Sequence, residues 1–349
     1  MKLNVENFLS EGKENAIIDV RTPAEFKSGH IPGAYNIPLL SNEGRAVVGT
    51  LYKHEGKERA FIKALELTGP EMANFVRKAK EISQATGSSR LYVYCWRGGM
   101  RSGSMSWLFD AAGFESHTLE GGYKAYRAHI RNNISKSQNI IILGGYTGSG
   151  KTEILKEIGK RSQAIDLEGI AHHKGSAFGF IGQEKQPTSE HFENILGYKW
   201  LDLDISKPIW LEDESRNIGS VYLPENLYAM MRDAPVIFLD VDKEIRIKRL
   251  IKEYAVFDTA LLQQALDKIY RRIGGDNHKK ATEALKNRDF YTVADITLSY
   301  YDKAYLYGLN KRNKNKIFKL NIDFDDPKKA AEMVLEYYEF ISPIHHGYN

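Results

Sequence analysis

Short apolar runs alternate with amphipathic segments along the first part of the chain. Continuous runs of Ile, Val, Leu and Tyr are typical of strands that are covered on both faces. Such runs predict strands at residues 16–20, 91–94 and 117–119. Helices are expected from Pro23, which stands just inside a start capped by Thr22, and over residues 102–112. This alternation predicts an α/β domain built on a parallel sheet.

The second part of the chain has the same class of pattern without repeating any motif of the first. Three apolar runs predict strands at residues 140–143, 208–212 and 235–241. Each is followed by helical sequence, so a second parallel sheet is expected. Residues 244–290 are helical in pattern and densely charged, which predicts a largely exposed helical insertion. The polar segment 133–139 is the predicted linker between domains at residues 1–132 and 140–349.

Length and composition exclude several classes of protein. With 349 residues, 42% of them hydrophobic, the chain can bury two cores and is not a disordered tail. The apolar runs are far shorter than the ~18 residues of a membrane span. The first residues carry acid where a signal peptide would continue apolar, so we expect a cytoplasmic protein without a membrane partner. The single cysteine, Cys95, excludes internal disulfides and four-cysteine metal sites.

The lone cysteine stands where a predicted strand ends and a glycine-containing loop opens into a helix. Backbone N–H groups and the start of the helix favour a thiolate over a thiol in that place. Arg97 and Arg101 add positive charge, and Gly98 and Gly99 let the loop curl around an anion, with Trp96 beside them. A buried, inert thiol is the alternative, but such a thiol needs neither the arginines nor the glycines.

Two enzyme classes use a loop of this kind. The C-x5-R spacing of Cys95 and Arg101 matches cysteine phosphatases, whereas sulfurtransferases carry a persulfide on a similar loop. Three further motifs are Asp19-Val20-Arg21, Gly29-His30-Ile31-Pro32-Gly33-Ala34 and Leu119-Glu120-Gly121-Gly122-Tyr123. With them, residues 4–132 resemble the rhodanese family. That resemblance implies that the cysteine carries sulfur and that neighbouring residues mostly frame the site, with Asp19 as scaffold and not as a general acid. The framing positions are Asp19, Arg21 and His30.

The second domain opens with a phosphate-binding motif. Its sequence matches G-x-x-x-x-G-K-[ST], with a strand before it and a helix after it. The glycines let backbone N–H groups face phosphate oxygens, Lys151 adds a mobile positive charge, and Thr152 is able to bind Mg²⁺. The predicted phosphate-binding residues are Gly145, Tyr146, Thr147, Gly148, Ser149, Gly150, Lys151 and Thr152.

An acidic segment follows the predicted strand at residues 208–212. An NTPase carries the aspartate that organises Mg²⁺ at this position. The other interpretation is an acidic transition that caps the next helix through Ser215. The candidates in this segment are Glu212, Asp213, Glu214 and Arg216. No tightly bound cofactor is expected, and Mg²⁺ at Thr152 is the only metal ion considered.

The net charge of +4 hides a late basic stretch over residues 303–319. Its basic residues occur among aromatic residues and without an acid, which suits an RNA backbone with unstacked bases. They are Lys303, Lys311, Arg312, Lys314, Lys316 and Lys319. The favoured interpretation is a solvated loop with a hairpin turn at residues 310–313. Weaker candidates for RNA contact, each equally explained as surface charge, are Arg127, Arg131, Arg271, Arg272, His278, Lys279 and Lys280.

The order of the two domains and the motifs in each resemble the tRNA 2-selenouridine synthase family over about residues 4–340. The matching strings are Cys95 to Ser102, Gly144 to Thr152 and Glu212 to Gly219. The resemblance implies a transferase that converts wobble 2-thiouridine of tRNA to 2-selenouridine. Geranyl diphosphate first alkylates the sulfur, and selenium from selenophosphate then displaces the S-geranyl group. The implied partners are tRNA with wobble 2-thiouridine and an enzyme that supplies selenophosphate.

The two predicted anion sites motivate a hypothesis that assigns one of them to each step. The phosphate loop would grip the geranyl donor, and Cys95 would take up selenium while Arg97 and Arg101 hold the anion. Three other functions stay open on the residues alone. They are an ATP-dependent kinase with a regulatory rhodanese domain, a thiosulfate sulfurtransferase with a passive second domain, and an RNA-binding or nucleotide-sensing protein whose thiol is incidental.

Overall fold

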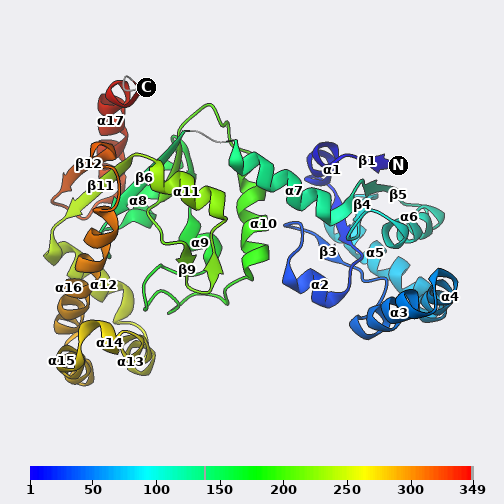
Figure 1. Ribbon diagram of the computed structural model, residues 1–349, viewed down its shortest axis with the longest axis horizontal. Helices are drawn as coiled ribbons and strands as arrows, with labels where there is room; N and C mark the ends of the chain where they lie inside the picture. Colours follow the sequence, from blue (N-terminus) through cyan, green and yellow to red (C-terminus); the bar gives the residue numbers. More distant parts are fainter. Residues whose placement is uncertain (137–138, 347–349) are drawn as a thin grey trace. The chain divides into compact units, whose positions relative to one another are not determined.

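The computed structural model describes residues 1–136 and 139–346. The chain divides into two compact units, one from Met1 to Ile134 and one from Ser135 onward (Figure 1). Helix α7 extends to Ser135, so the first residues of the predicted linker 133–139 are helical. Residues 137 and 138 of that prediction lie outside the described residues. No described helix combines the length and the apolar character needed to cross a membrane.

The first unit is built on a five-stranded parallel sheet with the order β1-β5-β4-β2-β3. Side chains of β4 alternate between its two faces. Leu91 and Val93 pack against α5 and α6, whereas the Tyr92 ring contacts Phe8 of α1 and the Tyr94 ring contacts Tyr123 of α7. Both faces are therefore buried, as the continuous apolar strands predict. The elements are β1 (Lys2–Leu3), α1 (Val5–Gly12), β2 (Ala16–Asp19), α2 (Pro23–Ser28), β3 (Tyr35–Asn36), α3 (Asn42–His54), α4 (Lys57–Thr68), α5 (Met72–Thr86), β4 (Arg90–Tyr94), α6 (Met100–Ala111), β5 (Glu115–Leu119) and α7 (Gly122–Ser135).

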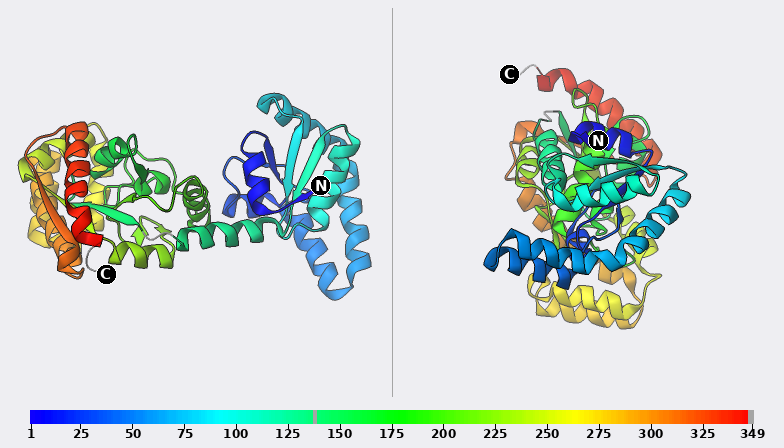
Figure 2. Two further views of the ribbon diagram at one scale, coloured as in Figure 1. Left: turned by 90° about the horizontal axis from the view of Figure 1, so that it is seen from above. Right: turned by 90° about the vertical axis from the view of Figure 1, so that its right-hand side faces the viewer.

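Local signals fix the helix that follows β2. The Thr22 hydroxyl accepts a hydrogen bond from the N–H of Glu25, and the Glu25 carboxylate accepts one from the N–H of Thr22. This reciprocal pair satisfies two N–H groups that a helix start leaves without partners. The predicted capped start at Pro23 is confirmed. Helices α3 and α4, which the sequence patterns did not single out, form a hairpin that projects from the unit (Figure 2).

The second unit contains another five-stranded parallel sheet, with the order β12-β11-β6-β8-β7. Helices α8 and α17 cover one face, where Ile154, Leu155 and Val334 pack against Leu143 and Trp210. Helix α11 lies against β6, and the Tyr305 hydroxyl of α16 approaches the backbone of the same strand. The elements are β6 (Ile140–Gly145), α8 (Lys151–Ile158), β7 (Gln163–Ile165), α9 (Leu167–Ala171), α10 (Ser189–Trp200), β8 (Ile209–Glu212), β9 (Asn217–Ile218), β10 (Val221–Tyr222), α11 (Glu225–Asp233), β11 (Val236–Val241), α12 (Lys243–Tyr254), α13 (Thr259–Lys268), α14 (Tyr270–Ile273), α15 (Gly275–Lys286), α16 (Phe290–Leu309), β12 (Ile317–Ile322) and α17 (Pro327–His346).

The predicted helical insertion corresponds to α12 through α15, and α13, α14 and α15 gather at one end of the second unit (Figure 1). The charge density predicts that these helices are largely exposed, and the structure corrects this prediction. Leu262, Leu266, Ile273 and Leu285 are all buried in a small core that α16 completes. The apolar positions recur at helical spacing between the charges, so one face of each helix is buried while the charged face meets solvent.

The late basic stretch does not contain the predicted hairpin turn. Lys303 belongs to α16, a short 3₁₀ turn spans Lys314–Lys316, and β12 then pairs in parallel with β11. A parallel pair requires a crossover connection, which α12 through α16 supply. Lys303 therefore lies on α16 and Lys319 on the edge strand β12. The other four, Lys311, Arg312, Lys314 and Lys316, lie in the short connection between these elements, two of them in the 3₁₀ turn.

Candidate functional site

Cys95 opens the loop after β4 and is buried, with 3% of its surface exposed. Its Sγ lies 3.2 Å from Oγ of Ser102 in the first turn of α6. Burial alone would raise the pKa of the Cys95 thiol. Hydrogen bonds from the Ser102 hydroxyl and from the N–H groups of Ser102, Gly99 and Arg97 outweigh this effect and lower the pKa. The loop thus favours a thiolate, which is the reactive form of cysteine.

Two glycines let the thiol loop and the turn after β5 come together. Gly98 and Gly122 both have positive φ, at 64° and 61°. A Cβ on Gly98 would lie 2.4 Å from the carbonyl oxygen of Leu119, and a Cβ on Gly122 would lie 2.3 Å from that of Cys95. Gly99 has a φ of −104° and no close neighbour, so only Gly98 of the predicted pair requires glycine.

The two arginines of the thiol loop differ in what they contact. The Arg101 guanidinium lies 2.8 Å from the Glu25 carboxylate of α2. Burial would raise the pKa of Glu25, but the hydrogen bonds from Arg101 and from the N–H of Thr22, together with the charges of Arg101 and Arg21, outweigh it and lower the pKa. Arg97 contributes its backbone N–H to the thiol, and the residue is exposed. Arg101 is thus already paired, and the expectation that both guanidinium groups hold an anion at the thiol stays a prediction.

The predicted framing residues form a buried structure beside the loop. Asp19 and Arg21 are both fully buried, with Nη2 of Arg21 2.7 Å from Oδ2 of Asp19. The Arg21 guanidinium stacks 3.7 Å from the Tyr123 ring centre. His30 stacks on Phe26, and burial lowers the pKa of its ring. Asp19 has no exposed surface, so it supports the sheet and does not meet a substrate.

The phosphate loop joins β6 to α8. Gly148 and Gly150 both have a φ of 79°, a conformation that favours glycine. The Lys151 ammonium donates to the carbonyl oxygen of Gly145 at 3.1 Å, and the Thr152 hydroxyl donates to Oε2 of Glu168 at 2.8 Å. Helix α8 begins at Lys151, so its first N–H groups and its positive dipole end face the loop.

Helix α12 supplies two arginines to the phosphate loop that sequence patterns did not identify. A Cβ on Gly150 would lie 1.2 Å from Nη1 of Arg249, so this guanidinium lies directly on the loop. Arg249 also pairs with Asp325. Arg246 is buried, pairs with Asp302, and donates to the carbonyl oxygen of Thr147 at 3.3 Å. No local motif marks either arginine, because the helix carrying them lies about a hundred residues beyond the loop.

The acidic segment after β8 is divided between two environments. Asp213 accepts a hydrogen bond from the Tyr305 hydroxyl at 2.7 Å and pairs with the buried Arg312. Because the Tyr305 hydroxyl also accepts the N–H of Gly145 at 3.0 Å, this network holds the start of the loop. Both carboxylate oxygens of Asp213 are thereby engaged. Asp213 is therefore not free to organise Mg²⁺, in contrast to the expectation from the sequence.

The neighbouring glutamates lie close together beneath the phosphate loop. The N–H of Glu168 donates to the fully buried Glu212 at 3.2 Å. Burial and the charge of Glu168 raise the pKa of Glu212 to about 8, and the same two causes raise the pKa of Glu214 well above its usual value. Arg216 is exposed on the loop that follows. No group of three or more His, Cys, Asp or Glu side chains in the described ranges is placed to hold a metal ion.

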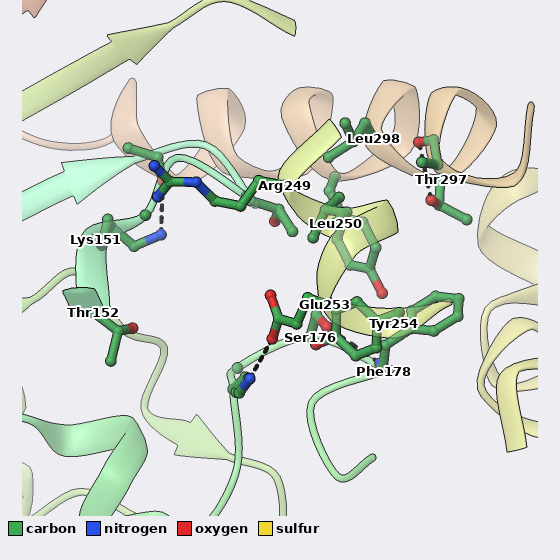
Figure 3. Close-up of a pocket in the computed structure, with 18 of the residues that line it drawn as sticks. Lys151, Thr152, Ser176, Phe178, Arg249, Leu250, Glu253, Tyr254, Thr297 and Leu298 are labelled. Atoms are coloured by element: carbon green, nitrogen blue, oxygen red, sulfur yellow. Dashed lines mark hydrogen bonds and ion pairs between the residues drawn. The ribbon is translucent and has the colours of Figure 1, made fainter. Parts of the chain in front are cut away.

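A pocket of about 400 Å³ connects the phosphate loop with an apolar interior (Figure 3). Gly148, Lys151, Thr152 and Arg249 line one end. Side chains of α12, α13 and α16 and of the loop before α10 line the other. In Figure 3, Leu250, Tyr254 and Leu298 surround the space opposite Lys151. The apolar residues of this end are Phe178, Leu250, Tyr254, Leu262, Phe290, Val293, Ala294 and Leu298.

Most polar groups at the apolar end already have partners within the protein. The Thr297 hydroxyl donates to the carbonyl oxygen of Val293 at 2.9 Å, and the Tyr301 hydroxyl accepts the N–H of Ala177 at 3.0 Å. Lys174 pairs with Glu253. The pocket therefore has an anion-binding end and an apolar end, where few polar groups need a hydrogen bond from a ligand.

The predicted RNA-contact residues are partly engaged elsewhere. Arg312 is buried, as described above, which removes it from any surface contact. Lys316 pairs with Asp233 at 3.1 Å and Lys319 with Asp240 at 2.6 Å. Within the described ranges, the basic stretch keeps three exposed lysines without an ion pair: Lys303, Lys311 and Lys314.

Comparisons with known proteins bear on both units. Residues 4–129 match the rhodanese-like domain, and residues 138–326 match the family described as the tRNA 2-selenouridine synthase AAA domain. The tRNA 2-selenouridine synthase of Nitrosomonas europaea is 32% identical, covering 88% of this chain and 92% of that protein. The chain belongs to the tRNA 2-selenouridine synthase family. Proteins of the same name from Shewanella pealeana (35% identical) and Bordetella petrii (34%) cover 88% and 86% of the chain, and 92% and 89% of their own lengths.

Membership of the tRNA 2-selenouridine synthase family confirms the predicted fold class. The first unit is the rhodanese domain and the second is the AAA domain, each with its own parallel sheet. The matched ranges place Cys95 in the former and the phosphate loop in the latter.

Replacing Ser102 by Ala is expected to raise the pKa of the Cys95 thiol by about one to two units. A hydrogen bond to a charged group contributes about 1.5–3 kcal/mol, and 1.36 kcal/mol corresponds to one unit. The pH midpoint of the alkylation rate with iodoacetamide measures this shift without interference, because Cys95 is the only thiol in the chain. Ser104→Ala on the exposed side of α6 is the control. An unchanged midpoint in Ser102→Ala would show that the hydroxyl does not stabilise the thiolate.

Gly122→Ala is expected to destabilise the rhodanese domain more than Gly113→Ala does. Both positions have positive φ and so share a cost of about 1–2 kcal/mol. Only Gly122 would also meet the Cys95 carbonyl, whereas nothing lies within 4 Å at Gly113. We expect an additional loss of about 1–3 kcal/mol from this overlap, measured by chemical denaturation. Equal losses in the two variants would contradict the close approach.

Proposed function

We propose that this protein is a tRNA-modifying enzyme that converts wobble 2-thiouridine to 2-selenouridine through an S-geranyl intermediate. Relatives that match most of the chain are named tRNA 2-selenouridine synthase, and this similarity supports a tRNA substrate and a selenium product. The observation that carries the geranyl step is the pocket, which combines an anion-binding end with an apolar end. A prenyl diphosphate has this same division between a charged head and an apolar tail.

The same pocket is a poor match for the base and ribose of ATP. A nucleoside presents several hydrogen-bonding groups, and burying them without partners is costly. At the apolar end Thr297, Tyr301 and Lys174 already bond to other groups of the protein. An isoprenoid tail needs only apolar surface, so geranyl diphosphate is favoured over a nucleotide.

In the first step, Lys151 and Arg249 hold the diphosphate against the N–H groups of the phosphate loop. The carbon–oxygen bond of the geranyl donor breaks and its electron pair leaves with the diphosphate. A lone pair of the thiouridine sulfur forms the new carbon–sulfur bond, and the ring nitrogen N3 loses its proton. Thr152 and Glu168 would hold Mg²⁺ together with phosphate oxygens, as Mg²⁺ sites commonly combine one or two carboxylates with substrate phosphates.

We assign the selenium step to the thiol loop of the rhodanese domain. Alkylation turns the thiocarbonyl sulfur into a better leaving group. The Cys95 thiolate displaces geranyl thiolate from the ring carbon, the selenium of selenophosphate then displaces the Cys95 thiolate, and water cleaves the phosphorus–selenium bond and releases phosphate. The N–H groups of Ser102, Gly99 and Arg97 stabilise the thiolate. Selenophosphate, supplied by another enzyme, is the selenium donor in this proposal.

The tRNA is held mainly through its phosphates, which makes binding sensitive to salt. Lys303, Lys311 and Lys314 are the strongest contacts in the basic stretch, because the other basic residues there are paired or buried. The pairing of Lys316 and Lys319 with aspartates of the same domain reduces the charge they offer to RNA.

Single substitutions are expected to separate the two steps. Lys151→Ala and Arg249→Ala should lower geranylation of 2-thiouridine tRNA by at least about a hundred-fold, because each removes a cation from the leaving diphosphate. Both should still selenate tRNA that already carries the S-geranyl group. Cys95→Ala should do the opposite. Nucleoside analysis by mass spectrometry after single-step reactions measures both products.

Lys160→Ala is the matched control for the phosphate-loop variants. Lys160 is exposed and, among the described residues, forms an ion pair only with Glu157 at the end of α8. It should retain both activities. Normal geranylation by Lys151→Ala would show that the phosphate loop does not take part in geranylation. Normal selenation by Cys95→Ala would show the same of the thiol for the selenium step. Protection against thermal unfolding by ATP but not by geranyl diphosphate would favour the kinase alternative instead.

A further inference from the structure

One face of α16 lines the pocket over most of the helix. The lining positions recur every three or four residues, which is the spacing of a single helical face. They include Phe290, Val293, Ala294, Thr297, Leu298 and Tyr301, and the face continues through Ala304 to Tyr305. From Tyr305 to Phe290 is fifteen residues (305 − 290), or about 22 Å along the axis. The pocket therefore has a direction and a length set by this helix.

The phosphate loop lies at one end of this row of pocket-lining positions. The Tyr305 hydroxyl accepts the N–H of Gly145 at 3.0 Å, so the C-terminal end of the face lies at the loop itself. Arg246 makes a second connection, because it pairs with Asp302 of α16 and donates to Thr147 of the loop. Each turn of α16 toward its N-terminus lies about 5.4 Å farther from the phosphate loop.

Apolar side chains close the other end. Phe290 and Val293 pack with Leu262 of α13 and Leu285 of α15 in one cluster. Between the two ends, Ala294 and Thr297 are the small side chains of the face and leave room for a ligand. The hydroxyl of Thr297 is bonded to its own helix backbone, so this middle region is apolar in effect.

We propose that this face of α16 sets the length of the prenyl group, with Ala294 beside the end of the accepted tail and Phe290 as the stop. The inference rests on the proposed function, because it assumes a prenyl diphosphate in the pocket. It assigns specificity to two residues that do not contact the reacting atoms.

The dimensions fit two isoprene units. An extended chain advances about 1.2 Å per bond, from about 3.5 Å for the three bonds of a residue. If the diphosphate occupies the first turn, the tail begins near Tyr301. The seven bonds of the geranyl main chain then span about 8 Å, which ends just short of Ala294, about 10 Å away. The eleven bonds of farnesyl span about 13 Å, which passes Val293 and brings the third unit against Phe290.

The test compares prenyl diphosphates within each variant. The kcat/KM values for dimethylallyl, geranyl and farnesyl diphosphate are measured with a 2-thiouridine tRNA, using full-length protein. Phe290→Ala should raise the ratio of farnesyl to geranyl by at least about ten-fold, since a single methylene in a pocket already changes discrimination by about ten-fold or more. Ala294→Leu should lower the ratio of geranyl to dimethylallyl by a similar factor.

Tyr291→Ala is the matched control, because Tyr291 is the adjacent aromatic residue of α16 but is exposed and bonded to Glu244 outside the pocket. It should leave all ratios unchanged. Ratios measured within one variant cancel any loss of folded protein. If the wild-type protein transfers geranyl but neither substitution moves its ratio, the length scale is wrong while the proposed function stands. If the wild-type protein transfers no prenyl group, the proposed function itself fails.

Discussion

The hydroxyl of Tyr305 connects the phosphate loop to the helix that shapes the rest of the pocket. It accepts the N–H of Gly145 and donates to Asp213, which in turn pairs with the buried Arg312. A buried charge pair of this kind is costly to break, because each partner would be left without compensation. The chain of contacts therefore holds the end of β6, the end of β8 and the C-terminal part of α16 in one arrangement.

Both domains build an anion site in the same way. In each, a loop follows a central parallel strand and leads into a helix, so backbone N–H groups converge on one point. The rhodanese domain places a sulfur atom at that point, whereas the AAA domain leaves the point open to a ligand and adds Lys151 and Arg249. The difference in chemistry comes from a few side chains on a common backbone plan.

Local sequence predicts the parts of these sites that are continuous in the chain. The strands before Cys95 and before the phosphate loop, the capped start at Pro23 and the two motifs are all readable because their signals lie within a few residues of each other. Each loop motif therefore identifies the strand–loop–helix unit that carries it. What a motif alone does not contain is the set of groups that pack against it from elsewhere.

The residues that complete each site come from distant segments, and local sequence patterns do not identify these partners. Arg312 appears in a basic run, yet it is buried against Asp213, 99 residues away in the chain. Arg101 stands beside the thiol in sequence but pairs with Glu25. Charge patterns show where cations occur and not which acids face them in the fold. The pattern at 303–319 therefore does not reveal that Arg312, Lys316 and Lys319 pair with aspartates, and no local pattern identifies Arg249.

In the proposed function, the helices inserted between β11 and β12 let a common phosphate loop serve a prenyl donor. The loop recognises only the shape and charge of a diphosphate, so it does not distinguish a nucleotide from a prenyl donor. That choice is made by the surface beyond the phosphates. Helices α12, α13 and α16 build this surface from side chains such as Leu250, Leu262 and Leu298. Most polar groups on this surface, such as the Thr297 hydroxyl, are hydrogen-bonded within the protein. With the proposed prenyl donor, selectivity at this site then depends on the size and hydrophobicity of the tail.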